Sequence, residues 1–125
     1  MKYQKNCIIR SFNKFNPMTS SVKIDGKDPT IGMFGGGGVG KTSITLQYVR
    51  GEFTDTYVPT IEDDFSKLVD YKGQTLKVYI VDTAGQEDFA ELRYKNYSSV
   101  HSFFFVFDVT NAKSIDELKA SYNDA

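Results

Sequence analysis

Residues 35–42 read GGGGVGKT, and this stretch decides the fold that the rest of the sequence is expected to adopt. It satisfies the pattern Gly-x4-Gly-Lys-[Ser/Thr] and follows a short apolar run at residues 30–34. Behind it, residues 42–50 mix apolar and polar side chains as a short helix does, and Gly51 ends the pattern. A glycine loop between a strand and a helix can cradle phosphate, because its N–H groups converge where no Cβ intervenes.

Each part of this loop has a predicted role with a nucleoside triphosphate. Lys41 would reach the β- and γ-phosphates, and the Thr42 hydroxyl would ligate Mg²⁺. The predicted nucleotide contacts in this stretch are Gly35, Gly36, Gly37, Gly38, Val39, Gly40, Lys41, Thr42 and Ser43. The alternative is a flexible glycine-rich loop with an incidental Lys-Thr pair. Gly32 favours that alternative, because a glycine inside a strand lowers the stability of the strand by about 0.5–1 kcal/mol relative to alanine.

A second motif, VDTAGQE at residues 81–87, follows directly from a predicted strand. Open α/β sheets bind their ligands at the carboxyl ends of the strands, so these side chains are expected beside the phosphate site. Asp82 suits a water-mediated contact with Mg²⁺, and Gly85 can bring its N–H to a γ-phosphate. Gln86 can orient an attacking water, because its amide both donates and accepts hydrogen bonds.

The remaining pattern predicts an α/β fold with a mainly parallel sheet and one antiparallel edge strand. The predicted elements after the first helix are a hairpin (65–71 and 75–81), a helix (90–97), a strand buried on both faces (103–109) and a helix (114–122). Residues 1–28 are more basic than the rest and show no sustained period, so they are predicted to be a flexible N-terminal arm. Weak attraction of this arm to an acidic surface is the alternative.

Composition excludes several classes of protein. The chain has 125 residues, is 40% hydrophobic and 25% charged, and fits one domain. A net charge of −1 gives no reason to expect nucleic acid as a partner. The single cysteine, Cys7, favours a reducing, cytoplasmic location. No run approaches the ~18–20 apolar residues of a transmembrane segment, and neither terminus carries a lipidation signal.

Through these motifs, residues 30–125 resemble the small GTPases of the Ras superfamily. The phosphate loop, the segment YVPTIED at residues 57–63 and DTAGQE at residues 82–87 occur in that family's order and spacing. Residues 60–65 are similar to the effector segment of the Ras branch. The resemblance implies a P-loop NTPase G-domain over residues 29–125. It also implies a GTP-binding molecular switch in signal transduction that hydrolyses GTP slowly, with Mg²⁺, to GDP and phosphate.

The resemblance also carries roles to individual residues. The implied catalytic residues are Gln86, Thr60 and Lys41, and the implied metal ligands are Thr42, Thr60 and Asp82. Further implied nucleotide contacts are Phe53, Tyr57, Thr60, Asp82, Thr83, Ala84, Gly85 and Gln86. Phe53 would pack against the base, with a plain core position as the alternative. Effector proteins would contact residues 57–65, and activating and exchange proteins are expected as well.

Relative to that family the chain looks truncated at its C-terminus. The Asn-Lys-x-Asp motif and the Ser-Ala-Lys-like loop that grip guanine do not occur in it, so guanine specificity rests on the resemblance. The strand at 103–109 would then be an exposed edge, and weak nucleotide binding or poor folding is expected. Two other functions stay open, a degenerate binding module without turnover and a P-loop ATPase of another family. Family members often sit on the inner membrane face.

Overall fold

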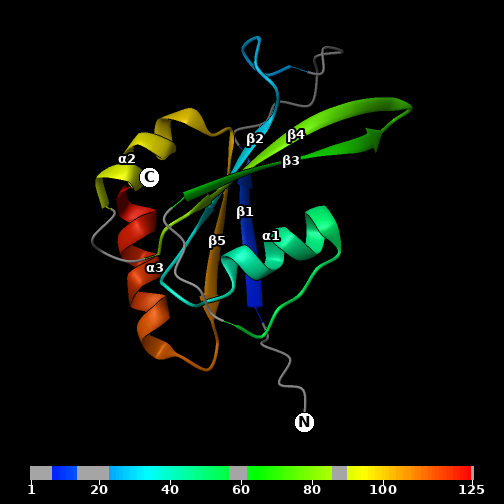
Figure 1. The fold of residues 1–125 in the computed structure, drawn as a ribbon. Coiled ribbons are helices and arrows are strands. Elements are labelled where there is room, and N and C mark those ends of the chain that lie inside the picture. Colours follow the sequence, from blue (N-terminus) through cyan, green and yellow to red (C-terminus); the bar gives the residue numbers. More distant parts are fainter. Residues whose placement is uncertain (1–6, 14–22, 57–61, 86–89, 125) are drawn as a thin grey trace.

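The computed structural model describes residues 7–13, 23–56, 62–85 and 90–124. Within these ranges a five-stranded sheet with the order β1-β5-β2-β4-β3 is flanked by helices (Figure 1). The elements are β1 (Cys7–Asn13), β2 (Thr30–Phe34), α1 (Lys41–Arg50), β3 (Glu62–Tyr71), β4 (Gln74–Thr83), α2 (Ala90–Ser99), β5 (Ser102–Asp108) and α3 (Ala112–Asp124). Among the helices of this described part, none is long and apolar enough to cross a membrane.

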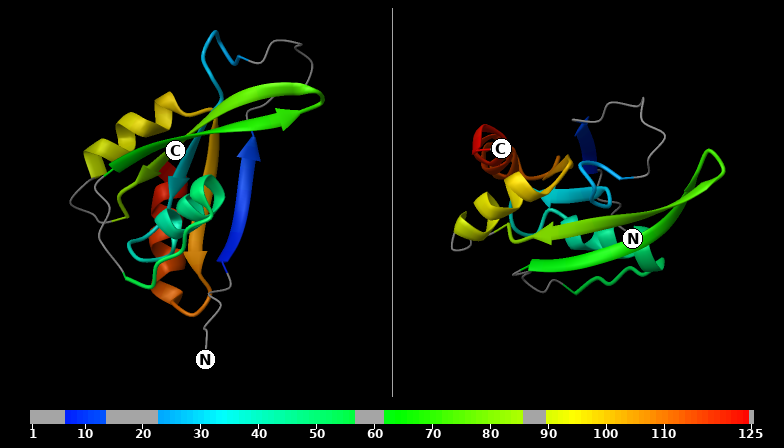
Figure 2. Two further views of the ribbon diagram at one scale, coloured as in Figure 1. Left: turned by 45° about the vertical axis from the view of Figure 1, so that its right-hand side comes forward. Right: turned by 90° about the horizontal axis from the view of Figure 1, so that it is seen from above.

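The central strand β2 runs parallel to both of its neighbours, β4 and β5. Its alternating side chains enter two different cores, because successive residues of a strand point to opposite faces. Phe34 packs with aromatic residues of β5 and with Tyr97 of α2, whereas Met33 packs with Val39, Ile80 and Val106. Helices α2 and α3 cover the first face and α1 covers the second, as the two views of Figure 2 show. The glycine loop leaves β2 between these two layers.

The predicted hairpin is confirmed, and its strands are longer than the pattern indicated. β3 and β4 pair antiparallel from Glu62 opposite Thr83 to Tyr71 opposite Gln74. The two turn residues, Lys72 and Gly73, have φ angles of 48° and 75°. Two left-handed residues make a turn whose twist matches the strands that it joins. This hairpin brings the end of β4 beside β2, where Asp82, the first residue of the DTAGQE motif, pairs with Met33.

The largest difference from expectation is β1, in the region predicted to be a flexible arm. β1 pairs antiparallel with the whole of β5, from Cys7 opposite Asp108 to Asn13 opposite Ser102. The predicted arm over 1–28 is therefore wrong for these residues, and the predicted exposed edge at 103–109 is wrong as well. The physical reason is that the outer N–H and C=O groups of β5 need hydrogen-bond partners, which β1 supplies. The α/β fold is confirmed, with a second antiparallel edge added.

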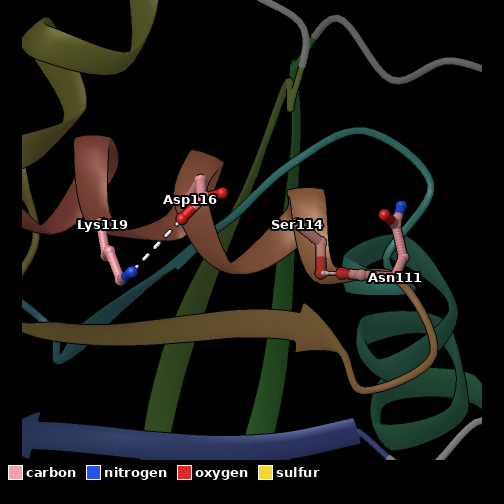
Figure 3. A network of polar contacts seen from close by, with 4 residues as sticks. All are labelled: Asn111, Ser114, Asp116 and Lys119. Carbon is pink, nitrogen blue, oxygen red and sulfur yellow. Dashed lines mark hydrogen bonds and ion pairs between the residues drawn. The ribbon is translucent and has the colours of Figure 1, made fainter.

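The last helix begins at Ala112, earlier than Ser114, where the sequence pattern places its start. Ser114 is fully buried, and its hydroxyl accepts a hydrogen bond from Asp108 N at 3.0 Å. The hydroxyl also donates a hydrogen bond to Asn111 O at 2.7 Å (Figure 3). The hydroxyl thus joins the first turn of α3 to the end of β5.

Candidate functional site

The candidate site is built on the glycine loop that joins β2 to α1. Three of its glycines, Gly35, Gly38 and Gly40, have left-handed φ angles of 144°, 73° and 111°. A Cβ on Gly35 would also lie 2.1 Å from the carbonyl oxygen of Val106 in β5. Because helix α1 begins at Lys41, directly after the loop, the positive end of its dipole faces the loop. No side chain caps this end of the helix. The loop thus has the glycine conformations and the helix start that the predicted anion cradle requires.

Lys41 lies inside this loop. Its side chain is buried, and Nζ donates hydrogen bonds to Gly35 O at 2.9 Å and Gly36 O at 2.7 Å. These carbonyl oxygens hold the ammonium group at the centre of the turn without neutralising its charge. A buried cation in this position favours an anionic ligand.

Asp82 and Thr42, both predicted metal ligands, are brought together at the edge of the loop. Asp82 is completely buried at the end of β4, and the Thr42 hydroxyl donates a hydrogen bond to its Oδ2. The other carboxylate oxygen, Oδ1, is buried without a hydrogen-bond partner among the described residues. Burial raises the pKa of Asp82 above its ordinary value of 3.8, while the Thr42 hydrogen bond and the charge of Lys41 pull it down.

This pair fits a magnesium ion. Carboxylate and hydroxyl oxygens are the hard ligands that Mg²⁺ prefers, and the ion usually keeps several waters beside one or two carboxylates. The partnerless Oδ1 of Asp82 is an oxygen that a cation or a cation-bound water would satisfy. Thr42 and Asp82 are therefore the described residues that could hold it.

The segment after β4 lies directly on the loop. A Cβ on Gly85 would be 2.3 Å from Gly36 C and 2.4 Å from Gly37 N, so only glycine permits this approach. Upstream, the buried Thr83 hydroxyl donates to Met33 O at 2.5 Å, which ties β4 to β2, and Ala84 is buried too. The structure thus brings residues 82–85 to the phosphate loop, as the sequence predicts.

Other predicted site residues are placed differently or lie outside the described part. Phe53 is 68% exposed, so the alternative of a core position is wrong. Val39 is buried in the core beside α1, which leaves its backbone as the group that can face the loop, and Ser43 is half-buried in the first turn of α1. Tyr57, Thr60 and Gln86 lie outside the described residues, and their roles stay predictions.

Three polar side chains outside the motifs make contacts that the sequence pattern does not predict, two of them near the loop and one at the opposite end of β2. Asn96 of α2 is buried and donates from Nδ2 to Glu62 Oε2 at 2.6 Å, which ties α2 to the start of β3. The carboxylate of Glu117 in α3 reaches Gly36. Thr30 N donates to His101 Nδ1 at 3.0 Å, and His101 N donates to Thr30 O at 2.8 Å. These two hydrogen bonds join the start of β2 to the residue before β5.

Comparison with known proteins places this sequence in a family. The model of the Ras family matches residues 30–125. The GTP-binding protein Di-Ras1 of Mus musculus is 40% identical over 95 residues, which cover 76% of this chain and 48% of that protein. The GTP-binding protein rhb1 of Schizosaccharomyces pombe is 40% identical over 93 residues, or 74% of this chain and 50% of rhb1. The human GTP-binding protein Rheb is 38% identical over the same shares. The chain spans about half the length of these relatives.

Proposed function

Because this chain belongs to the Ras family, we propose that it forms the phosphate-binding and nucleotide-sensing part of a GTP-binding molecular switch. The observation that carries the proposal is the constellation of Lys41, Thr42 and Asp82 around a glycine loop. A buried cation, a helix N-terminus and a carboxylate with one unpartnered oxygen suit a triphosphate and its metal ion. The choice of GTP as the nucleotide is inferred from the relatives, which are described as GTP-binding proteins, and not from a base contact in this chain.

Binding would use the loop as a fixed, positive cradle. The amides of the loop and of the first turn of α1 would donate to phosphate oxygens, and Lys41 would lie against the β- and γ-phosphates. Mg²⁺, held by Thr42 and Asp82, would supply charge stabilisation for the phosphates. Since the lysine already lies in place, little reorganisation is needed when the ligand arrives.

Hydrolysis would be an in-line attack of water on the γ-phosphorus, forming a bond to the water oxygen and breaking the bond to GDP. Gln86 and the backbone of Thr60 would orient the water, and Lys41 and the loop amides would stabilise the charge that develops on the phosphate oxygens. The motifs at residues 35–42, 57–63 and 82–87 contain no arginine, so we expect that an arginine from a partner would accelerate this step. The expected intrinsic rate is accordingly low.

The switch would operate through the two segments next to the described site. A γ-phosphate would order the segments around Thr60 and Gly85, and its loss would release them. Effectors would read residues 57–65 and add a strand to the sheet at residues 63–66, because β3 is an edge strand. Asp63 and Asp64 are exposed there, so the favoured partner strand is basic.

The deciding experiment measures nucleotide binding and turnover by the 125-residue chain. Titration with GTP should show binding that requires Mg²⁺ and that Lys41→Ala or Asp82→Ala abolishes. Single-turnover phosphate release should then be faster in the wild type than in Gln86→Leu. Equal release by the two would favour the binding module without turnover. No nucleotide binding with Mg²⁺ in excess would overturn the proposed function.

A further inference from the structure

Glu117 lies outside the motifs of the sequence, yet its carboxylate reaches the phosphate loop from α3. A Cβ on Gly36 would lie 1.9 Å from Glu117 Oε2 and 3.0 Å from its Cδ, and the nearest neighbours of that position are all atoms of Glu117. Gly36 is buried and has no left-handed φ, unlike Gly35 before it. The neighbouring carboxylate, and not backbone strain, therefore favours glycine at this position.

The peptide at Gly36 is held on two further sides. Lys41 Nζ donates to its carbonyl oxygen at 2.7 Å. The turn after β4 lies on its other side, since a Cβ on Gly85 would meet Gly36 C at 2.3 Å. Gly36 is thus the point where groups from α1, from α3 and from the turn after β4 meet. A side chain that touches this point can influence both the shape of the loop and the electrostatic field inside it.

The charge of Glu117 opposes the anion for which the loop is suited. Lys113 Nζ lies 3.6 Å from Glu117 Oε1, but the Lys113 side chain is 82% exposed. Because the Lys113 end of this pair is in water, its charge is screened and neutralises the carboxylate of the less exposed Glu117 only in part. A negative group beside the converging amides and Lys41 cancels part of the positive potential that a triphosphate would meet.

We propose that Glu117 is a positioning residue that holds the phosphate loop from α3 and lowers the affinity of the loop for a nucleoside triphosphate. This inference rests on the triphosphate binding proposed above. A switch has to release its nucleotide, and a carboxylate placed against the loop keeps the bound triphosphate exchangeable. Glu117 acts through the loop and contacts no reacting atom.

The first test neutralises the carboxylate at constant shape. Glu117→Gln in the 125-residue chain should raise the affinity for Mg-GTP by about three- to tenfold at low ionic strength. The gain should shrink as salt is added, which a purely structural role would not produce. The readout is the dissociation constant from titration with a fluorescent GTP analogue, with inorganic tripolyphosphate as a base-free competitor.

Asp116→Asn is the matched control, because it changes the net charge by the same amount on the same helix. The Asp116 side chain is 77% exposed and lies 3.2 Å from Lys119 Nζ (Figure 3). It should alter the affinity by less than about twofold, since an exposed charge is screened. An equal gain in both variants would assign the effect to net charge and overturn the inference.

The second test asks whether the effect travels through Gly36. Gly36→Ala leaves the backbone angles allowed, so the added methyl group should displace the flexible end of Glu117 from the loop. Its affinity gain should resemble that of Glu117→Gln, and the double variant should gain no more than the larger single change. Additive gains, or no gain in Gly36→Ala, would overturn the inference.

Failure of this inference and failure of the proposed function give different results. Binding of Mg-GTP by the wild type that Glu117→Gln leaves unchanged overturns the inference alone. No binding by the wild type or by Glu117→Gln overturns both. Binding that appears in Glu117→Gln and is too weak to measure in the wild type supports both. Thermal melting of each variant distinguishes these outcomes from loss of the folded chain.

Discussion

At the scale of single residues, the features of the site that suit a ligand lower the stability of the ligand-free chain. Asp82 is completely buried, one of its oxygens lacks a partner among the described residues, and burial raises its pKa. A charged group in such a place costs free energy of folding unless a ligand compensates. Gly85 likewise lacks a side chain so that its backbone can lie against the backbone of Gly36 and Gly37. The residues that suit the ligand are therefore those that stabilise the ligand-free chain least.

Asp82→Asn should stabilise the chain in the absence of Mg²⁺ and abolish its Mg²⁺-dependent binding of GTP. The folded state holds the Asp82 proton more tightly than the unfolded state, so the wild type should lose stability as pH rises from about 3.8 through the raised pKa. At neutral pH we expect the variant to be about 1–3 kcal/mol more stable. Urea unfolding at several pH values checks this. A variant that is less stable than the wild type at pH 7 would show that the buried carboxylate of Asp82 does not destabilise the ligand-free chain.

Gly32→Ala should destabilise the chain, although the change removes a residue unfavourable to strands. A Cβ at this position would lie 2.4 Å from Phe34 Cε2 and 3.1 Å from Val100 Cγ1. Phe34 is fully buried and its ring cannot turn away, so overpacking should cost about 1–3 kcal/mol. Thermal melting measures the loss, and Phe34→Leu should absorb part of it in the double variant. An unchanged melting temperature would show that the ring does not require this glycine.

At the scale of elements, β1 shows how a strand can depend on a partner far along the chain. Its pairing joins Cys7 to Asp108 and Asn13 to Ser102. Local composition favoured an arm, because nothing within the segment itself encodes the free edge of β5. Once β5 is buried in the sheet, however, any strand able to pair with it gains a full ladder of hydrogen bonds.

Proline scanning of β1 tests this pairing. Ile9 and Arg10 are neighbours opposite Val106 and Phe105, so one of their N–H groups points to β5 and the other points away. Ile9→Pro and Arg10→Pro should therefore differ, with the more damaging change costing about 3 kcal/mol through the lost hydrogen bond and ring clash. Urea unfolding gives both values. Wild-type midpoints for the two variants would mean that β1 does not pair with β5 in solution.

The predictable elements share a local signal. The glycine loop, α1 with its glycine stop and the hairpin turn at Lys72 and Gly73 are encoded by neighbouring residues, and the structure places them where the pattern does. Lys41, Thr42 and Asp82 were predictable because each belongs to a motif. The contacts of Asn96 and Glu117 were not predictable, because each of these helix residues contacts a segment far away in the sequence.

At the scale of the whole molecule, the described part of the site offers groups suited to phosphate and metal but no comparable groups for a base. The described residues around the loop offer groups for phosphate and metal, and they come from α1, the end of β4 and α3. Phe53, the residue expected at the base, is 68% exposed. The groups proposed to bind phosphate are thus held by buried contacts, whereas the described residues provide no comparable framework for a base.

The 125-residue chain should therefore distinguish poorly between nucleotides that differ only in the base. We expect dissociation constants for Mg-GTP and Mg-ATP within about tenfold of each other, because ~1.4 kcal/mol of base contact would already give a tenfold preference. Inorganic tripolyphosphate should compete with both. Competition titration with a fluorescent GTP analogue measures all three, and Phe53→Ala should change the GTP value little. A preference for GTP well beyond tenfold that is lost in Phe53→Ala would show that this chain already holds a base site, with Phe53 as its anchor.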